Sequence, residues 1–157
     1  MSAERSWRTS TRSARGTRGV GRRIGEVLEA GTVLALNGDL GAGKTTFVQG
    51  LAAGLGVVDL DEVLSPTYTL VNEYPAANLT LIHIDFYRLD DPTAARALGL
   101  EEYVGRCDAV VAIEWPKQIA ELIPTNAVWI ELARRGTNTC EIEVRGIARP
   151  RGIRPRG

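Results

Sequence analysis

Cysteine is scarce in this 157-residue sequence. Cys107 and Cys140 are the only two, and they stand far apart with no paired spacing. A disulfide framework or a cysteine-based zinc site needs several cysteines at short, regular spacings. We therefore expect reduced thiols without a chemical role, as in a cytoplasmic protein.

Long apolar runs are also missing. No stretch approaches the roughly 20 apolar residues that a membrane-spanning helix needs, and the basic N-terminal segment lacks the apolar region of a secretory signal peptide. We therefore expect a cytoplasmic protein without a membrane partner. The composition, with 44% apolar and 24% charged residues, suits one domain with a sizeable core.

Lysine is rare too, since only Lys44 and Lys117 are lysines among 19 basic residues. Lys44 lies in the string GDLGAGKT at 38–45, which completely matches the phosphate-binding loop pattern and follows the apolar run 33–36. A strand, this loop and a helix in that order form the context in which the pattern binds nucleotide phosphates. The alternative is a glycine-rich turn that binds nothing, and this context argues against it.

The residue types of the loop suit a phosphate group. Gly38, Gly41 and Gly43 let backbone N–H groups turn inward around an anion, and the helix that begins near Lys44 adds the positive end of its dipole. Lys44 is expected to reach the β and γ phosphates, and the Thr45 hydroxyl to bind Mg²⁺. The Asn-Lys-x-Asp element with which switch GTPases recognise guanine is absent, so we expect ATP rather than GTP.

Two carboxylates follow apolar strands. Asp85 comes directly after 81–84, and its separation from Lys44 along the sequence suits a Walker B aspartate. Glu114 ends the strand expected over 109–113. Ligands of α/β sheets gather beyond the carboxyl ends of strands. Asp85 and Glu114 are therefore candidate catalytic residues with Lys44, because carboxylates there hold Mg²⁺ or orient an attacking water. The alternative for each is a helix cap or a surface ion pair.

Three further side chains lie near these positions in the sequence. Thr67, in the segment 65–69, is the candidate sensor of the γ-phosphate and the metal, and a simple turn is the alternative. Trp115 either stacks on a nucleotide or partner or packs at the edge of the core. His83 alternates with core positions on a strand, which indicates a packed, hydrogen-bonded residue rather than a base.

The apolar pattern predicts an α/β fold, a single-domain P-loop NTPase with a mixed sheet flanked by helices. A hairpin makes the sheet mixed rather than all parallel. The expected helices are one capped by Thr17 and ended by Gly31, one over 44–55 and one over 92–104. The expected strands are 33–37, 68–74, 79–84, 109–113, 127–132 and 139–145.

Charge is distributed unevenly along the chain. Residues 1–23 carry seven Arg and one Glu, residues 24–133 carry five basic and sixteen acidic groups, and residues 134–157 carry seven Arg and two Glu. We therefore expect a basic, flexible tail at 1–16, a P-loop ATPase domain at 17–146 and a basic tail at 147–157. The tails contact RNA phosphates or an acidic partner, or they are solvated, partly disordered ends.

Five blocks of the sequence, in their order and spacing, resemble the TsaE (YjeE) family. They are GDLGAGKTT at 38–46, SPTYTLVNEY at 65–74, HIDFYRL at 83–89, LGLEEY at 98–103 and IEWP at 113–116, and the resemblance covers about residues 17–133. The phosphate-binding loop alone is generic, whereas five ordered blocks are specific. This family is the ATPase component of the bacterial machinery that makes threonylcarbamoyladenosine in tRNA.

The resemblance implies a function and a set of site residues. The function is ATP hydrolysis that resets a complex of the threonylcarbamoyl transferase and its paralogous partner, with at most indirect contact to tRNA. Thr45 and Glu114 would bind Mg²⁺, and Asp85 would position water or support the metal. The implied ATP-binding residues are Thr17 on the adenine side, Gly38, Asp39, Leu40, Gly41, Ala42, Gly43, Lys44, Thr45 and Thr46 in the loop, and Thr67 and Trp115 as switch and nucleotide-edge or partner contacts.

One departure from the family and two alternative functions stay open. The family's Gly-Arg near the late strands is replaced by Gly136-Thr137, so a nucleotide contact from Arg134 or Arg135 is undecided. A small-molecule kinase shares the loop but needs an acceptor pocket and an arginine-bearing lid. A binding module with negligible turnover is the third class. Because the acidic body contains few arginines, we expect hydrolysis to be slow without partner proteins.

Overall fold

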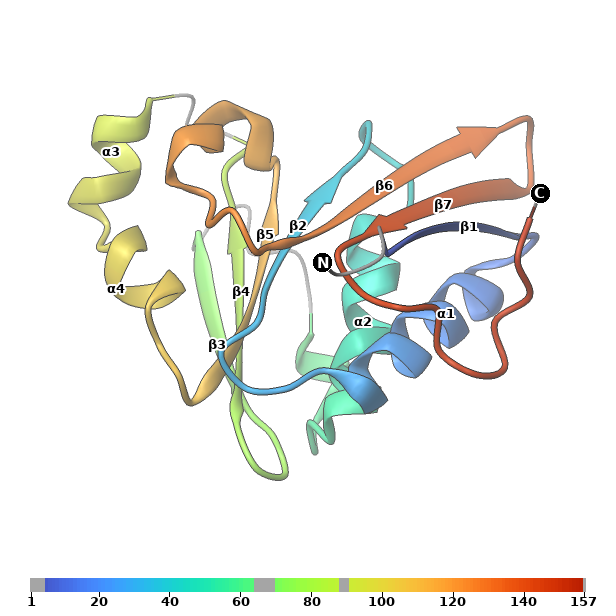
Figure 1. Cartoon of the computed structure of the whole chain (residues 1–157), viewed down its shortest axis with the longest axis horizontal. Coiled ribbons are helices and arrows are strands. Elements are labelled where there is room, and N and C mark those ends of the chain that lie inside the picture. Colours follow the sequence, from blue (N-terminus) through green and yellow to red (C-terminus); the bar gives the residue numbers. More distant parts are fainter. Residues whose placement is uncertain (1–4, 64–69, 88–90, 157) are drawn as a thin grey trace.

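The computed structural model describes residues 5–63, 70–87 and 91–156, and within them seven strands form one sheet in the order β1-β7-β6-β2-β5-β4-β3 (Figure 1). The strands are β1 (Ser6–Thr11), β2 (Val33–Asn37), β3 (Val71–Pro75), β4 (Thr80–Asp85), β5 (Ala109–Glu114), β6 (Val128–Arg135) and β7 (Thr139–Arg145). The helices are α1 (Ala14–Val27), α2 (Lys44–Leu55), α3 (Pro92–Ala97) and α4 (Leu100–Val104), with 3₁₀ turns η1 (Leu60–Glu62) and η2 (Pro116–Leu122).

The sheet is mixed, as the sequence predicts. Strand β2 lies between β5 and β6 and is parallel to both, and β4 is parallel to β5. The pairs β3–β4, β6–β7 and β1–β7 are antiparallel. The predicted α/β fold with helices flanking a mixed sheet is confirmed. None of the described helices has both the length and the apolar character that crossing a bilayer requires.

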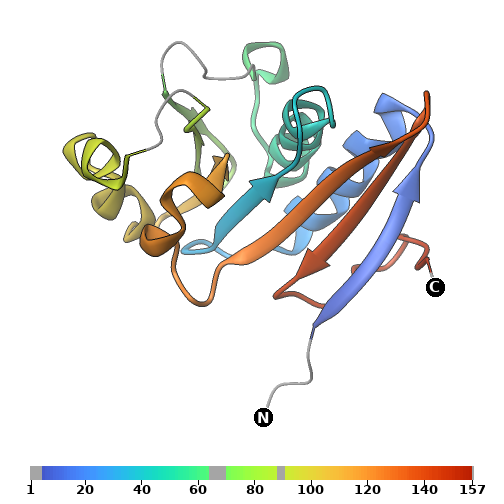
Figure 2. The same ribbon diagram turned by 90° about the horizontal axis from the view of Figure 1, so that it is seen from above.

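Helices cover both faces of the central strands. Strand side chains alternate between the two faces, so in β2 Leu34 and Leu36 belong to one apolar cluster while Val33 and Ala35 belong to another. Helices α1 and α2 supply the first cluster, and α3, α4 and η2 supply the second; Figures 1 and 2 show the two groups of helices on opposite sides of the sheet. Burial on both faces explains why these strands read as continuous apolar runs.

Helices α1 and α2 touch backbone to backbone through glycines. A Cβ atom on Gly50 would lie 2.0 Å from the carbonyl oxygen of Arg18, and one on Gly21 would lie 2.3 Å from that of Phe47. No side chain fits into such a contact. The crossing therefore fixes α2, whose first turn closes the phosphate-binding loop, against α1.

The N-terminal segment differs from its prediction. The expectation of a flexible tail over 1–16 is wrong for residues 6–11, which form the edge strand β1 along β7. The inward-facing positions include Thr9 and Thr11, which are buried. Because these buried side chains are polar, the segment lacks the apolar alternation by which strands are recognised.

The C-terminal segment is also part of the fold. The Thr9 hydroxyl donates to the carbonyl oxygen of Arg154 at 2.7 Å, and the Arg156 amide donates to that of Arg8 at 2.7 Å. Residues 154–156 therefore cover the edge of β1, where an uncovered strand would expose backbone groups to other chains. The described parts of the two basic segments, 6–11 and 154–156, therefore pack against each other at this edge of the sheet instead of projecting as tails.

Two helix boundaries differ from those predicted. Helix α1 begins at Ala14 because Ser13 caps it, its hydroxyl accepting a hydrogen bond from the Gly16 amide at 3.0 Å. Thr17 is therefore inside the helix and is not its cap. The single helix expected over 92–104 is two short helices, because the backbone turns left-handed at Gly99 (φ 83°).

The glycine contact generates a stability prediction with a matched control. Gly50→Ala should lower the free energy of unfolding by about 1–3 kcal/mol, since its methyl group forces the two helices apart. Gly19→Ala, in α1, should raise it by up to about 1 kcal/mol through helix propensity, because among the described residues no atom beyond its chain neighbours and its own helix backbone lies within 4 Å of the added carbon. Urea unfolding of both variants checks this, and equal effects would contradict the role given to the crossing.

Candidate functional site

The phosphate-binding loop joins the end of β2 to the start of α2. Gly43 precedes the helix with φ 107°, and no side chain caps it. Gly43 therefore supplies no side-chain acceptor to the first backbone amides of α2, which is the arrangement that binds anions. Gly38 is required for another reason, because a Cβ there would lie 2.6 Å from the carbonyl oxygen of Leu132 on β6.

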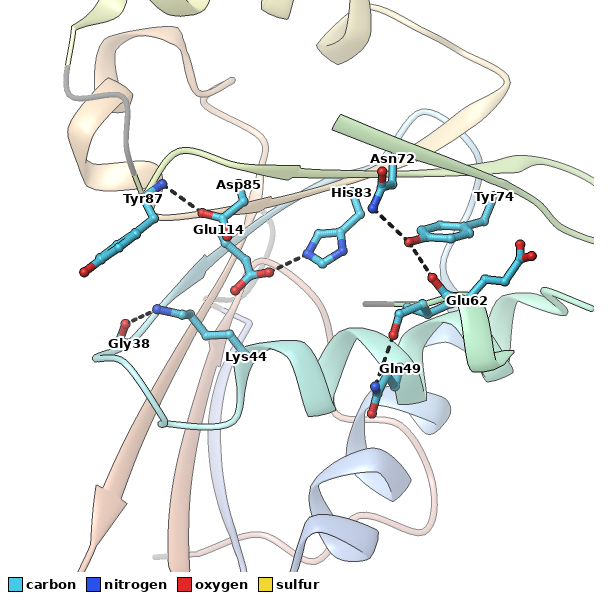
Figure 3. A network of polar contacts seen from close by, with 11 residues as sticks. Gly38, Lys44, Gln49, Glu62, Asn72, Tyr74, His83, Asp85, Tyr87 and Glu114 are labelled. Carbon is cyan, nitrogen blue, oxygen red and sulfur yellow. Dashed lines mark hydrogen bonds and ion pairs between the residues drawn. The ribbon is translucent and has the colours of Figure 1, made fainter. Parts of the chain in front are cut away.

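Lys44 is folded back over its own loop. Its ammonium group donates to the carbonyl oxygen of Gly38 and lies 3.5 Å from the ring centroid of Trp115 (Figure 3 shows the Gly38 bond). The residue is only 5% exposed, and this burial lowers the pKa of Lys44, although the carboxylates of Glu114, Asp85 and Asp39 oppose the shift. A buried cation attracts a phosphate that enters the same space more strongly than an exposed cation does, because little water screens the two charges.

Asp85 and Glu114 meet at one edge of the sheet. They lie opposite each other in the parallel register of β4 and β5, and each is 2% exposed. Asp85 accepts a hydrogen bond from the Tyr87 amide at 2.8 Å, and Glu114 Oε2 lies 2.5 Å from His83 Nε2 (Figure 3). Burial at the strand ends excludes the surface ion pair that the sequence left open for these residues.

The loop, the two carboxylates and Trp115 enclose one hollow of about 380 Å³. Its lining residues are Leu40, Gly41, Gly43, Lys44, Thr45, Thr46, Asp85, Tyr87, Glu114 and Trp115. Residues predicted from three separate sequence blocks therefore line the same space. A larger hollow of about 570 Å³ lies over α1 and α2 and is lined by Arg15, Arg18 and Arg22, but it contains neither the loop nor the buried carboxylates.

The phosphate-binding loop also lines a second hollow, of about 200 Å³. This second hollow shares Gly41, Gly43 and Thr46 with the hollow that contains Lys44. Thr17, predicted on the adenine side, lines this hollow. The Thr17 hydroxyl is hydrogen-bonded to that of Thr11 at 2.7 Å. The site therefore has one compartment with the lysine and carboxylates and another next to β1 and α1.

The structure also separates the two late-strand arginines. Arg134 lines the second hollow and donates to the carbonyl oxygen of Gly41 at 3.2 Å. Arg135 instead pairs with Glu141 at 3.0 Å. Of the two, Arg134 is the one placed to contact a ligand of the loop.

The predicted site residues and those that line the two hollows differ at several positions. Thr67, the expected phosphate sensor, lies outside the described residues. Asp39 lines neither hollow but contributes its charge near Lys44. Sequence reasoning missed Tyr87, whose ring centroid is 5.1 Å from that of Trp115, and Arg12, which lines the second hollow. The only signal for Tyr87 was its place in the block 83–89.

The donor set fits magnesium better than a metal held by protein alone. No group of three His, Cys, Asp or Glu side chains that could hold a metal occurs among the residues that the structure describes. Mg²⁺ is usually bound by one or two carboxylates together with water and substrate phosphates. The Thr45 hydroxyl and the buried carboxylates, on one hollow with an uncapped helix start, supply those elements.

A complete phosphate-binding loop between a central parallel strand and a helix, facing two buried carboxylates, defines a P-loop nucleotide-binding protein. The sequence profile of the family "Threonylcarbamoyl adenosine biosynthesis protein TsaE" matches residues 11–142. The chain therefore belongs to the TsaE family, as the five sequence blocks indicated.

Individual relatives agree with this assignment. Proteins named "tRNA threonylcarbamoyladenosine biosynthesis protein TsaE" are 39% identical in Bacillus subtilis, over 87% of this chain and 82% of that protein, and 41% identical in Treponema pallidum, over 87% and 98%. A Nostoc relative with the same name is 45% identical, over 66% of this chain but 64% of its own length. The crystal structure of YdiB from Bacillus subtilis superposes with a TM-score of 0.76 at 32% identity, covering 92% of this chain and 88% of that one.

The contact between Lys44 and Trp115 predicts an optical signal. The chain has three tryptophans, and replacing Trp7 and Trp129 by Phe leaves Trp115 as the reporter. Adding a nucleoside triphosphate should change its emission, because Lys44 must leave the ring to reach the phosphates. The single variant Trp115→Phe should lose this response. Unchanged Trp115 emission at saturating nucleotide, with binding confirmed by calorimetry, would contradict the expected movement of Lys44.

Proposed function

We propose that this chain binds ATP with Mg²⁺ and hydrolyses it. Hydrolysis resets the complex that makes threonylcarbamoyladenosine in tRNA. The proposed location is the cytoplasm, where ATP and tRNA occur. The observation that supports this most directly is the convergence of Lys44, Asp85 and Glu114 on one hollow at the start of α2. The names of the relatives supply the pathway. The partners proposed are the threonylcarbamoyl transferase and its paralogous subunit, with tRNA in at most indirect contact.

Each side chain has a separate task in this proposal. The loop amides and Lys44 hold the β and γ phosphates, and Lys44 exchanges the Gly38 carbonyl for phosphate oxygens. Thr45 and Glu114 bind Mg²⁺, which neutralises charge on the phosphates. Asp85, held by the Tyr87 amide, positions the water that attacks the γ-phosphorus while the bond to ADP breaks. Thr17 and Arg134 face the nucleoside from the second hollow.

The isolated chain is expected to hydrolyse ATP slowly because of the cations that its site contains. Fast phosphoryl transfer uses a cation beyond the loop lysine and the metal, often an arginine supplied in cis or in trans. Among the described residues, no arginine lines the hollow that contains Lys44 and Glu114. We therefore propose that the transferase complex accelerates hydrolysis, by supplying a missing group or by ordering the site.

The kinase alternative receives less support. Its lid arginines would be Arg134 and Arg135, but both lie on strand β6, and Arg135 is paired with Glu141. Strand residues of a packed sheet do not close over a substrate as a lid does. A nucleotide-dependent binding module remains the other outcome of the experiment below.

Phosphate release measures the proposed activity, and the two lysines provide a matched pair. Lys44→Ala should reduce hydrolysis by about 10²-fold or more, because it removes a preorganised charge from the transition state. Lys117→Ala should change it little, since that side chain is 67% exposed. The wild type should release phosphate faster with the transferase pair than alone. Equal rates alone and with the pair would refute partner control, and full activity of Lys44→Ala would refute the P-loop assignment.

The two carboxylates should give different phenotypes. Glu114→Ala should raise the Mg²⁺ concentration needed for ATP binding by about 10–100-fold, because a metal ligand is lost. Asp85→Ala should mainly slow turnover while the Mg²⁺ dependence stays near that of the wild type. Magnesium titrations of binding with a fluorescent ATP analogue check this. Superimposable titrations for the wild type and Glu114→Ala would remove Glu114 from the metal.

A further inference from the structure

His83 is the only histidine of the chain, and it lies against a proposed metal ligand. It sits on β4, two residues before Asp85, and none of its surface is exposed. Its Nε2 atom is 2.5 Å from Glu114 Oε2. Its other ring nitrogen, Nδ1, has no hydrogen-bond partner in the part of the chain that the structure describes.

This geometry selects one tautomer of the ring. A neutral imidazole carries its proton on one nitrogen and a lone pair on the other. A proton on Nδ1 would be a buried donor without an acceptor, and the Nε2 lone pair would then face the carboxylate of Glu114. A proton on Nε2 instead makes a short, charge-assisted hydrogen bond to that carboxylate.

The bond leaves one oxygen of Glu114 for other partners. Oε2 is engaged by His83, while the second carboxylate oxygen lies on the side of Lys44 in Figure 3. A flexible glutamate so near a lysine would otherwise be drawn into an ion pair with it. A ligand whose orientation is set by a neighbouring hydrogen bond binds a metal more tightly than one that is free to rotate.

The buried position also argues against a purely structural role. Strand β4 is buried on both faces, and its other central residues, Leu81, Ile82 and Ile84, are apolar. A ring nitrogen without a partner costs stability there, whereas an apolar side chain costs none. Stability alone does not account for a histidine at this place.

We propose that His83 is a positioning residue, which donates a hydrogen bond from Nε2 to Glu114 and thereby orients this carboxylate for Mg²⁺ in the nucleotide site. The proposal rests on the proposed function, because it takes Glu114 as a metal ligand. Its first test does not depend on ATP, Mg²⁺ or turnover.

The first test reads the tautomer by NMR. Because the chain has one histidine, the imidazole ¹H–¹⁵N correlation spectrum of tag-free protein contains a single side-chain pattern. We expect the Nε2–H tautomer and a proton shifted downfield by the short bond. Glu114→Ala should abolish the downfield shift, and Asp85→Asn should leave it. An Nδ1–H tautomer, or an unchanged shift in Glu114→Ala, would overturn the proposal.

The second test asks whether the bond orients the metal ligand. The amide nitrogen of glutamine reaches about as far as Nε2 of histidine, whereas that of asparagine reaches only as far as Nδ1. His83→Gln should therefore keep the magnesium midpoint for binding of a fluorescent ATP analogue within about threefold of the wild type. His83→Asn and His83→Leu should raise this midpoint by about tenfold or more, with metal-free nucleotide binding unchanged.

The outcomes separate the two proposals. Equal midpoints for the Gln, Asn and Leu variants would overturn the positioning role even if the NMR spectrum shows the bond. If the wild type binds ATP with Mg²⁺ but releases no phosphate, the proposed hydrolysis fails while both tests of His83 stand. Thr9→Val, which removes a partly buried hydrogen bond on β1, controls for destabilisation. Midpoint changes as large in Thr9→Val as in His83→Leu would also overturn the proposal.

Discussion

The parallel pairing of β2, β4 and β5 is the constraint on which the site depends. Their carboxyl ends lie at one edge of the sheet because parallel strands run in the same direction, and the register places Glu114 opposite both Asp85 and Leu36. The loop leaves β2 directly beyond that edge. Two carboxylates and a phosphate-binding loop therefore share one hollow, although the chain separates them widely. This is the ligand position typical of open α/β sheets.

A second contact fixes the helix that completes the site. The backbones of α1 and α2 meet through Gly21 and Gly50, so the uncapped start of α2 is held by the packing of its own body. Helix α1 is in turn preceded by β1, whose edge is covered by residues 154–156. Residues 6–11 and 154–156 thus complete the half of the sheet that carries Arg134, next to helix α1 with Thr17. Part of the positive charge of these segments is paired within the chain, as in the ion pair of Arg156 with Glu141.

The polar interior of the site is organised around one lysine. Lys44 has a pKa lowered by burial, and nearby carboxylates favour its charged form. Glu114 would compete for this cation, but one of its oxygens is bonded to His83. The ring of Trp115 occupies another side of the ammonium group. Lys44 and Glu114 are thus close together, and each can still bind another group, Lys44 a phosphate and Glu114 a metal ion. This suits a site that must accept phosphate and metal together.

The features that depend on short stretches of chain were predictable from the sequence. The loop at 38–45, the buried strands around it, the hairpin and the family blocks are local patterns of apolar and glycine residues, so the fold class and the core of the site were predictable. The remaining features depend on contacts between distant parts of the chain. Strand β1 was missed because Thr9 and Thr11 are polar, and its partner strand lies at the other end of the chain. The bond from His83 to Glu114 and the difference between Arg134 and Arg135 depend on strand register and side-chain direction. Such contacts join residues far apart in the sequence, and no local pattern encodes which of them will meet.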